Sequence, residues 1–298
     1  MPESTAAGRA VLSSGPRQPF GSRLAAAMTA RGPLCVGIDP HPGLLADWGV
    51  NDDVAGLERF SLTVVEAVAT LAAAVKPQVA LYERHGSAGI AVLERTLAAA
   101  SAAGVLSIAD AKRGDIGSTM AAYADAWLRD GSALAADSVT LSPYLGFESL
   151  RPALDLAAEY GRGVFVLALT SNPEGKSVQH VGGSESVARR IIEAAADENR
   201  RYTNAMGSAG MGSVGLVVGA TIGEALVELG VDLAAVRGPI LAPGLGAQGA
   251  TPADLRATFG DAYPAVLATS SRGILAGGPT IAGLRSATEA ARDGLLEG

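Results

Sequence analysis

Residues 103–119, AGVLSIADAKRGDIGST, contain the pattern that decides the fold of this chain. An apolar run over residues 103–109 leads directly into Asp-Ala-Lys-Arg-Gly-Asp at residues 110–115, where four of the six residues are charged. An Ala-rich stretch with helical spacing follows over residues 117–131. A short apolar run that ends in charge and is followed by a helical pattern predicts one β-strand and then one α-helix.

The same order of strand and helix repeats along the whole chain. The expected strands are residues 34–38, 75–81, 105–109, 138–141, 164–169, 214–218, 240–242 and 265–268. The expected helices are residues 54–73, 86–103, 117–131, 146–160, 185–202, 222–229, 252–258 and 279–296. Alternating strands and helices predict an α/β protein with a parallel sheet. Eight such units favour a closed (β/α)₈ TIM barrel, with an open doubly wound sheet as the alternative.

No linker divides the chain, so we expect a single catalytic domain. Residues 1–20 are rich in Ser, Pro, Gly and Ala and are expected to form a loose N-terminal tail, with the barrel over residues 21–298. The tail lacks the apolar stretch of a signal peptide, and no apolar run approaches the ~18 residues of a membrane span. These features predict a cytoplasmic protein with no membrane partner.

Composition narrows the classes of partner. The chain has 298 residues, of which 48% are apolar, and a net charge of −7. It contains no run of Lys and Arg of the kind that binds nucleic acid, so we expect no nucleic-acid partner. An anionic substrate must then be held by a few local cations. The single cysteine, Cys35, allows no disulfide within the chain and no thiolate metal cluster.

In a TIM barrel the chemistry lies at the carboxyl ends of the strands. The candidate functional residues are therefore the polar or turn residues that directly follow each apolar run. They are Asp39, Lys76, Asp110, Lys112, Pro143, Ser171, the loop 244–249 and Arg272. Residues 171–183 are too many for a routine strand-to-helix turn, and we interpret them as a candidate active-site loop.

The charged cluster at residues 110–115 is the strongest of these candidates. A period of two places Asp110 and Lys112 on the same face of their strand, toward the barrel mouth. An ion pair that closes the barrel top is the alternative, with Asp115 as a helix N-terminal acid. Buried charge contributes little to stability, so the clustering favours a functional site. A lysine held among carboxylates can serve as a general acid.

A glycine pattern marks the expected phosphate site. Gly244-x-Gly246-x-x-Gly249 matches a dinucleotide fingerprint, but it lies in the seventh unit and no acid follows the next strand. The loops after strands seven and eight of TIM barrels commonly bind phosphate through backbone N–H groups. Arg272 can add a bidentate contact to that phosphate.

These residues resemble a known family. Asp110-Ala-Lys-Arg-Gly-Asp115 is similar to the Asp-x-Lys-x-x-Asp signature of the orotidine 5′-phosphate decarboxylases, and the flanking residues are similar to its longer bacterial subclass, type 2. The resemblance extends from about Phe20 to the C-terminus. It is carried further by Val36–His41, Val75–Glu83, Gly117–Thr119, Tyr123 and Ser271–Ile274.

The resemblance implies a reaction and roles for four charged residues. The reaction is the conversion of orotidine 5′-monophosphate to UMP and CO₂ in de novo pyrimidine biosynthesis, with no cofactor and no metal. Asp39 and Lys76 are expected to bind the ribose hydroxyls, and Lys76 also braces Asp110. Asp110 is expected to face the substrate carboxylate, and Lys112 to donate the proton to C6.

The resemblance also implies a homodimer with shared active sites. Asp115 and Thr119 are expected to reach across the interface into the neighbouring site. Ser171 is expected to hydrogen-bond the pyrimidine ring. The remaining expected substrate contacts, mainly to the phosphate, are Pro243, Gly246, Gln248, Arg272 and Gly273. Arg113 receives no role.

Two alternatives remain open at this point. A sugar-phosphate aldolase or a keto-gulonate phosphate decarboxylase shares the Asp-x-Lys-x-x-Asp core but uses magnesium, held in part by a Glu at the end of strand two. Lys76 occupies that position here. A phosphate-binding barrel that senses a nucleotide without turnover is the second alternative.

Overall fold

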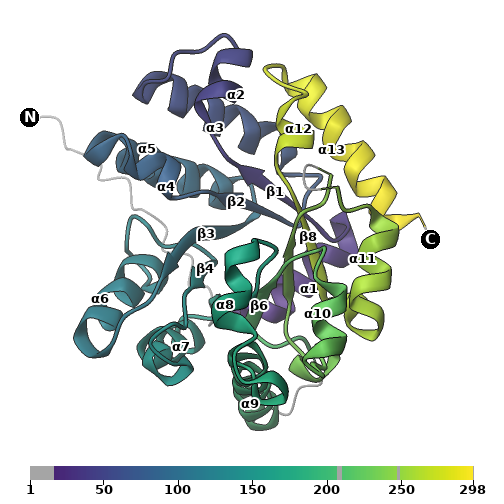
Figure 1. Ribbon diagram of the computed structural model, residues 1–298. Coiled ribbons are helices and arrows are strands. Elements are labelled where there is room, and N and C mark those ends of the chain that lie inside the picture. The colour runs from purple at the N-terminus through teal and green to yellow at the C-terminus, as the bar shows by residue number, and fades with distance from the viewer. Residues whose placement is uncertain (1–16, 207–209, 247–248, 298) are drawn as a thin grey trace, which may run out of the picture.

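The computed structural model describes residues 17–206, 210–246 and 249–297. The strands form a closed parallel barrel in the order β1 to β8, and the helices surround it (Figure 1). The strands are β1 (Leu34–Ile38), β2 (Ala74–Pro77), β3 (Leu106–Arg113), β4 (Ser138–Leu141), β5 (Gly163–Leu169), β6 (Val214–Val218), β7 (Ile240–Pro243) and β8 (Val266–Ser270). The predicted (β/α)₈ TIM barrel is confirmed, and the doubly wound alternative is wrong.

Eight helices follow the strands around the barrel. They are α3 (Val54–Val68), α5 (Gly86–Ala102), α6 (Gly117–Leu128), α7 (Arg151–Glu159), α9 (Val187–Met206), α10 (Gly223–Glu228), α11 (Pro252–Phe259) and α13 (Ile281–Leu296). Additional short helices are α2 (Pro42–Asp47), α4 (Ala80–Glu83), α8 (Lys176–Gln179) and α12 (Arg272–Leu275). The described residues also contain five 3₁₀ turns: η1 (Phe147–Leu150), η2 (Pro173–Gly175), η3 (Gly183–Glu185), η4 (Ala234–Val236) and η5 (Gly260–Ala265).

The core has two layers because side chains alternate along each strand. In β1, Leu34, Val36 and Ile38 pack toward the surrounding helices, whereas Cys35 points into the barrel. The interior cluster also includes Phe20 and Leu24 of a helix that precedes the barrel, α1 (Phe20–Arg31). Helix α1 therefore closes the floor of the barrel, at the amino ends of the strands.

The boundary between tail and barrel differs from the prediction. Phe20 is fully buried and makes an edge-to-face contact with Phe165, with ring centroids 5.9 Å apart. Arg17 forms an ion pair with Asp130 at 2.8 Å. Arg17 and Phe20 therefore contact the barrel, Phe20 because its apolar ring is buried in the floor and Arg17 because it pairs with a carboxylate. Residues 1–16 of the predicted tail lie outside the described residues.

Two strand predictions need correction. The strand expected over residues 75–81 ends at Pro77, and α4 follows at residues 80–83. A short apolar run fits a buried strand and a buried helix equally well, so its period could not separate the two. The strand expected over residues 105–109 continues to Arg113, so Asp110, Lys112 and Arg113 belong to β3 itself, whereas Asp115 follows it.

Candidate active site

A cavity of about 310 Å³ opens at the mouth of the barrel, where the strands have their carboxyl ends. Its lining residues are Asp39, His41, Lys76, Gln78, Asp110, Lys112, Leu167, Thr170, Val217, Leu241, Pro243, Gly244, Leu245, Thr269, Ser271 and Arg272. The charged members lie in or directly after β8 and β1 to β3, which are neighbours around the barrel. The apolar members Leu167, Val217 and Leu241 come from β5 to β7. The cavity thus has one charged side and one apolar side.

Asp110 is the centre of the charged side. Its side chain is only 8% exposed, and its two oxygens bind two different lysines. Lys76 Nζ lies 2.7 Å from Oδ2, and Lys112 Nζ lies 2.6 Å from Oδ1. Burial alone raises the pKa of Asp110, but the ammonium groups of Lys76 and Lys112 outweigh burial and hold this pKa well below its usual range. Asp110 is therefore ionised across the physiological pH range.

Lys76 is the buried partner in this cluster. Burial lowers the pKa of Lys76, but the carboxylates of Asp110 and Asp39 outweigh that effect and raise the pKa above its usual value. Lys76 thus carries a permanent positive charge beneath the cavity. The 2.7 Å ion pair between Lys76 and Asp110 is the direct contact that the predicted bracing requires.

Lys112 reaches the cavity through an irregular backbone. The expected period of two along a regular strand is wrong here, because β3 shifts its register against β4 between Ala109 and Arg113. Lys112 has a φ of 49°, a left-handed conformation that is uncommon for a residue other than glycine. The bulge turns Lys112 back toward Asp110, and its side chain stays 45% exposed. The Lys112 ammonium group is thereby held at the cavity wall.

Asp39 presents an acceptor without a protein partner. Its Oδ1 atom is buried, and no described residue donates a hydrogen bond to it. A buried carboxylate oxygen costs free energy when it makes no hydrogen bond. Since Asp39 lines the cavity, a ligand hydroxyl is a suitable donor for it.

Arg272 and Pro243 lie on the side expected to bind phosphate. Both line the cavity, and Arg272 begins the short helix α12 directly after β8. Lys76, Lys112 and Arg272 outnumber Asp39 and Asp110 in the lining, so the cavity carries a net positive charge in a protein of net charge −7. That local charge suits an anionic ligand.

The glycines expected beside the phosphate lie next to lining residues rather than among them. Gly273 follows Arg272, and Gly246 follows Leu245. Gly246 has a φ of 75°, which favours glycine, and its N–H donates to the carbonyl of Ala250. Gln248 lies outside the described residues.

The loop after β5 is folded back on the end of its own strand. Gln179 accepts a hydrogen bond from the Thr170 N–H at 2.9 Å and donates one to Thr170 Oγ1 at 2.7 Å. Thr170 also bonds Asn172. Thr170 lines the cavity, whereas Ser171, the residue predicted to bind the pyrimidine, is exposed beside it.

Asp115 and Thr119 are not brought to the cavity of their own chain. Asp115 accepts a hydrogen bond from the Ile116 N–H at 2.8 Å, and Thr119 is exposed in the first turn of α6. Arg113, which received no predicted role, points away from the cavity. It pairs with Glu83 and lies over the rings of Tyr123 and Trp127. Arg113 therefore ties β3 to α4 and α6.

Sequence reasoning missed several polar residues of the site. Among them are His41, Gln78, Thr170, Thr269 and Ser271 in the lining, and Thr140 behind it. Thr140 Oγ1 donates to Asp110 Oδ1 at 3.0 Å. The available signal was the sequence SVTL at residues 138–141, in which every second residue of a buried strand is polar.

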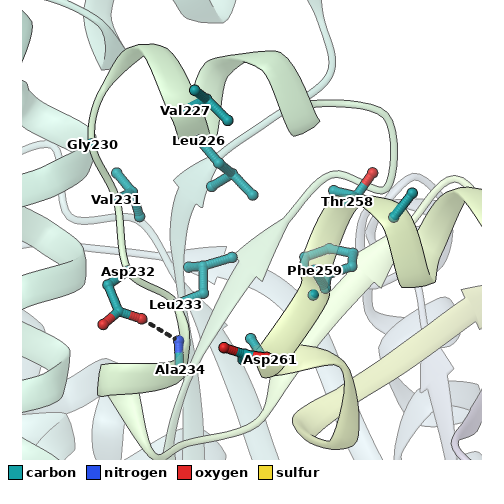
Figure 2. A pocket seen from close by; sticks show the side chains of 13 residues that line it. Leu226, Val227, Gly230, Val231, Asp232, Leu233, Ala234, Thr258, Phe259 and Asp261 are labelled. Carbon is teal, nitrogen blue, oxygen red and sulfur yellow. Dashed lines mark hydrogen bonds between the residues drawn. The ribbon is translucent and has the colours of Figure 1, made fainter.

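A second hollow, of about 380 Å³, has a different character (Figure 2). It lies between α10 and α11 near the amino ends of β7 and β8, at the opposite end of the barrel. Most of its lining residues have apolar side chains, and its charged members are Asp232 and Asp261. Asp232 accepts a hydrogen bond from the Ala234 N–H at 2.9 Å (Figure 2). Without a lining cation, this hollow does not suit an anionic ligand.

No group of three or more His, Cys, Asp or Glu side chains is arranged to hold a metal ion within residues 17–206, 210–246 and 249–297. No helix in those ranges combines the length and the apolar character that crossing a membrane requires.

Known proteins that are similar to this chain in sequence and in structure share one family name. The orotidine 5′-phosphate decarboxylase of Salinispora arenicola is 58% identical over 272 residues, which cover 91% of this chain and 94% of that protein. The enzyme of the same name from Streptomyces coelicolor is 56% identical over 275 residues, covering 91% and 95%. The crystal structure of a candidate orotidine 5′-phosphate decarboxylase from Streptomyces avermitilis superposes with a TM-score of 0.89 at 54% identity, covering 97% and 98%. Residues 32–286 match the orotidine 5′-phosphate decarboxylase / HUMPS family, and the chain is an enzyme that belongs to it.

Proposed function

We propose that this enzyme is a carboxy-lyase that converts orotidine 5′-monophosphate to UMP and CO₂, with Lys112 as the proton donor to C6. One observation carries the proposal. A buried Asp110 carboxylate lies between the ammonium groups of Lys76 and Lys112, at 2.7 and 2.6 Å, in the wall of a cavity of net positive lining charge. Such a constellation combines a fixed negative charge with a proton donor beside it.

The bond changes follow from this arrangement. The bond between C6 and the carboxylate carbon breaks, CO₂ leaves, and the electron pair of that bond stays at C6. The Lys112 ammonium stabilises this negative charge and then transfers a proton to C6, which completes UMP. Lys112 is left neutral and regains its proton from water. Charges already fixed in position need no reorganisation during the reaction, which is the main source of their catalytic effect.

Asp110 contributes on the other side of the reaction. Its permanent negative charge repels a substrate carboxylate placed against it, and this repulsion is relieved when CO₂ leaves. Lys76 and Thr140 hold the Asp110 carboxylate by hydrogen bonds at 2.7 and 3.0 Å. Asp110 therefore cannot turn away from the substrate without breaking both bonds.

Binding of the remote parts of the substrate supplies the energy for this close approach. We assign the phosphate to Arg272, with Gln248, Gly246, Gly273 and Pro243 around it. We assign the ribose hydroxyls to Asp39 and Lys76. The buried Oδ1 atom of Asp39 has no hydrogen-bond donor among the described residues. We assign the pyrimidine ring to Ser171 and to the apolar side of the cavity.

We further propose a homodimer in which Asp115 and Thr119 complete the partner's site. An exposed apolar patch formed by Ile116, Tyr144 and Leu145 supports it, with exposed fractions of 62%, 80% and 54%. The loops after β3 and β4 that carry this patch lie side by side, because the Ser142 N–H donates to the Arg113 carbonyl at 2.8 Å. Exposed apolar patches of this kind mark protein contacts.

The activity is tested by following the ultraviolet absorbance of orotidine 5′-monophosphate with protein treated with a chelator. We expect conversion to UMP without added metal. Conversion that returns only with magnesium contradicts the cofactor-free reaction and favours the magnesium-dependent sugar-phosphate enzymes of this barrel group. Binding of UMP without any turnover, with or without magnesium, favours a nucleotide sensor.

A further inference from the structure

Thr140, on β4, makes hydrogen bonds to both reaction-centre residues of β3. Its hydroxyl donates to Asp110 Oδ1 at 3.0 Å and accepts the backbone N–H of Lys112 at 2.9 Å. Neither direction is ambiguous, because a backbone N–H can only donate and an ionised carboxylate can only accept. One hydroxyl therefore links the charge of Asp110 to the backbone of Lys112.

The register of the sheet explains why Thr140 lies at this point. Ile108 pairs with Ser138 and Ala109 with Val139, but the next pairing is Arg113 with Leu141. Residues 110–112 of β3 thus bulge opposite the single residue Thr140. A bulge leaves backbone groups without their ladder partners and redirects the side chains that it carries. The Thr140 hydroxyl replaces the missing partner of the Lys112 N–H.

The bulge holds Lys112 in a conformation that its backbone does not favour. A φ of 49° is unfavourable for a lysine and persists only where the surroundings enforce it. The hydrogen bond from Lys112 N–H to Thr140 is one such constraint, and the contact of Lys112 Nζ with Asp110 Oδ1 at 2.6 Å is the other. Asp110 Oδ1, the Thr140 hydroxyl and both nitrogens of Lys112 form one closed set of contacts.

The burial of Thr140 indicates that its hydroxyl is required for the hydrogen bonds to Asp110 and Lys112. Thr140 is 1% exposed, and alternation along β4 turns it into the barrel while Val139 and Leu141 pack toward the helices. An apolar side chain would fill this interior position without the cost of burying a hydroxyl. Thr140 does not line the cavity, so any effect on the reaction must act through Asp110 and Lys112.

We infer that Thr140 is a positioning residue, which holds the Asp110 carboxylate and the Lys112 backbone in the geometry needed for proton transfer to C6. The inference rests on the proposed decarboxylase activity. Misplacement of a reacting group by about 1 Å can lower a rate by about 100-fold. Removal of this hydroxyl should therefore affect the chemical step more than substrate binding.

The test compares three variants with the wild-type enzyme. Thr140→Val removes the hydroxyl and keeps the shape, and Thr140→Ser keeps the hydroxyl. Thr288→Val is the matched control, because Thr288 is equally buried and its hydroxyl donates only to the Leu284 carbonyl in α13. For each protein, kcat, KM, the Kd for UMP and the melting temperature are measured.

We expect Thr140→Val to lower kcat by roughly 10- to 100-fold while KM and the Kd for UMP change less than about 3-fold. Thr140→Ser should recover most of kcat, and Thr288→Val should match the wild type. A wild-type kcat in Thr140→Val overturns the inference. So does a loss in Thr140→Ser as large as in Thr140→Val, or a loss of UMP affinity equal to the loss of kcat. A wild-type enzyme without turnover instead contradicts the proposed function.

Discussion

The two ends of the barrel each hold a charged cluster, but one cluster lines a cavity and the other binds neighbouring parts of the chain. The mouth cluster, Lys76, Asp110 and Lys112, lines a cavity. The floor cluster consists of Arg17, Arg23, Arg162, Asp130 and Asp137. In it, Arg162 pairs with Asp130 at 2.6 Å and Arg17 with the same carboxylate at 2.8 Å. Arg23 pairs with Asp137 and donates to the Gly161 carbonyl at 3.0 Å.

The side chains of the floor cluster bind groups of the protein and line neither cavity. Arg17 donates to the Tyr160 carbonyl, and Asp137 accepts the Ser107 N–H. These contacts tie the segment before and within α1 to the ends of other elements, and none of the five residues lines the mouth cavity or the hollow between α10 and α11. Clustered charge alone therefore does not mark a site. A site is marked by charge that faces a cavity beside an acceptor, such as Asp39 Oδ1, to which no described residue donates a hydrogen bond.

The largest expected effect breaks the mouth cluster at the proton donor. Lys112→Ala removes both the charge that stabilises the electron pair at C6 and the proton source, so we expect turnover to fall by about 10⁴-fold or more. UMP binding should largely survive, as measured by calorimetry. Undiminished turnover contradicts the proton-donor role.

The same variant tests the shared site. In the proposed dimer each active site takes Lys112 from one chain and Asp115 from the partner. The Lys112→Ala and Asp115→Ala substitutions therefore affect residues that different chains supply to the same site. Mixing the two inactive variants should then restore part of the wild-type activity, since hybrid dimers contain one intact site. Mixtures that stay inactive contradict a shared site.

A smaller effect is expected where the mouth binds phosphate. Arg272→Ala removes a charge-assisted contact, so we expect the Kd for UMP to rise by about 100-fold and the Kd for uridine by less than about 3-fold. Titration with both ligands measures the two losses. Equal losses for nucleotide and nucleoside remove Arg272 from the phosphate site.

The smallest effect on the reaction is expected at the floor. Asp137→Asn weakens a pair whose side chains are 21% and 19% exposed, so we expect a loss of about 1–3 kcal/mol in the free energy of unfolding. The value of kcat should stay within about 2-fold of the wild type. Denaturant unfolding and the absorbance assay measure the two quantities.

Glu193→Gln is the control for the floor variant. It breaks the Arg189–Glu193 pair on α9, in which Glu193 is 57% exposed, and should change stability by less than about 1 kcal/mol. If the floor variant loses kcat while its stability is unchanged, the floor cluster also serves the reaction, and the proposed difference between the two clusters is wrong.

Much of the site followed from local sequence. Apolar runs alternating with helical patterns predicted the barrel, because strand and helix periods are local properties. The rule that polar residues follow the strands predicted that Asp39, Lys76, Asp110, Lys112 and Arg272 meet, and all five line the cavity. This step works because the barrel brings the carboxyl ends of all its strands to one face.

The tertiary structure decided what the local patterns could not. The bulge at residues 110–112, the φ of 49° at Lys112 and the hydroxyl of Thr140 that supports both depend on the pairing of β3 with β4, whose residues lie about 30 positions apart. Contacts with α4 and α6 likewise turn Arg113 outward from a run of charges that otherwise serves the cavity. Side-chain alternation is a property of one strand, whereas register, bulges and hydrogen-bond partners are properties of a pair of strands. The sequence by itself therefore determined which charged residues gather at the mouth, and only the folded barrel determined the other lining residues and how each is held.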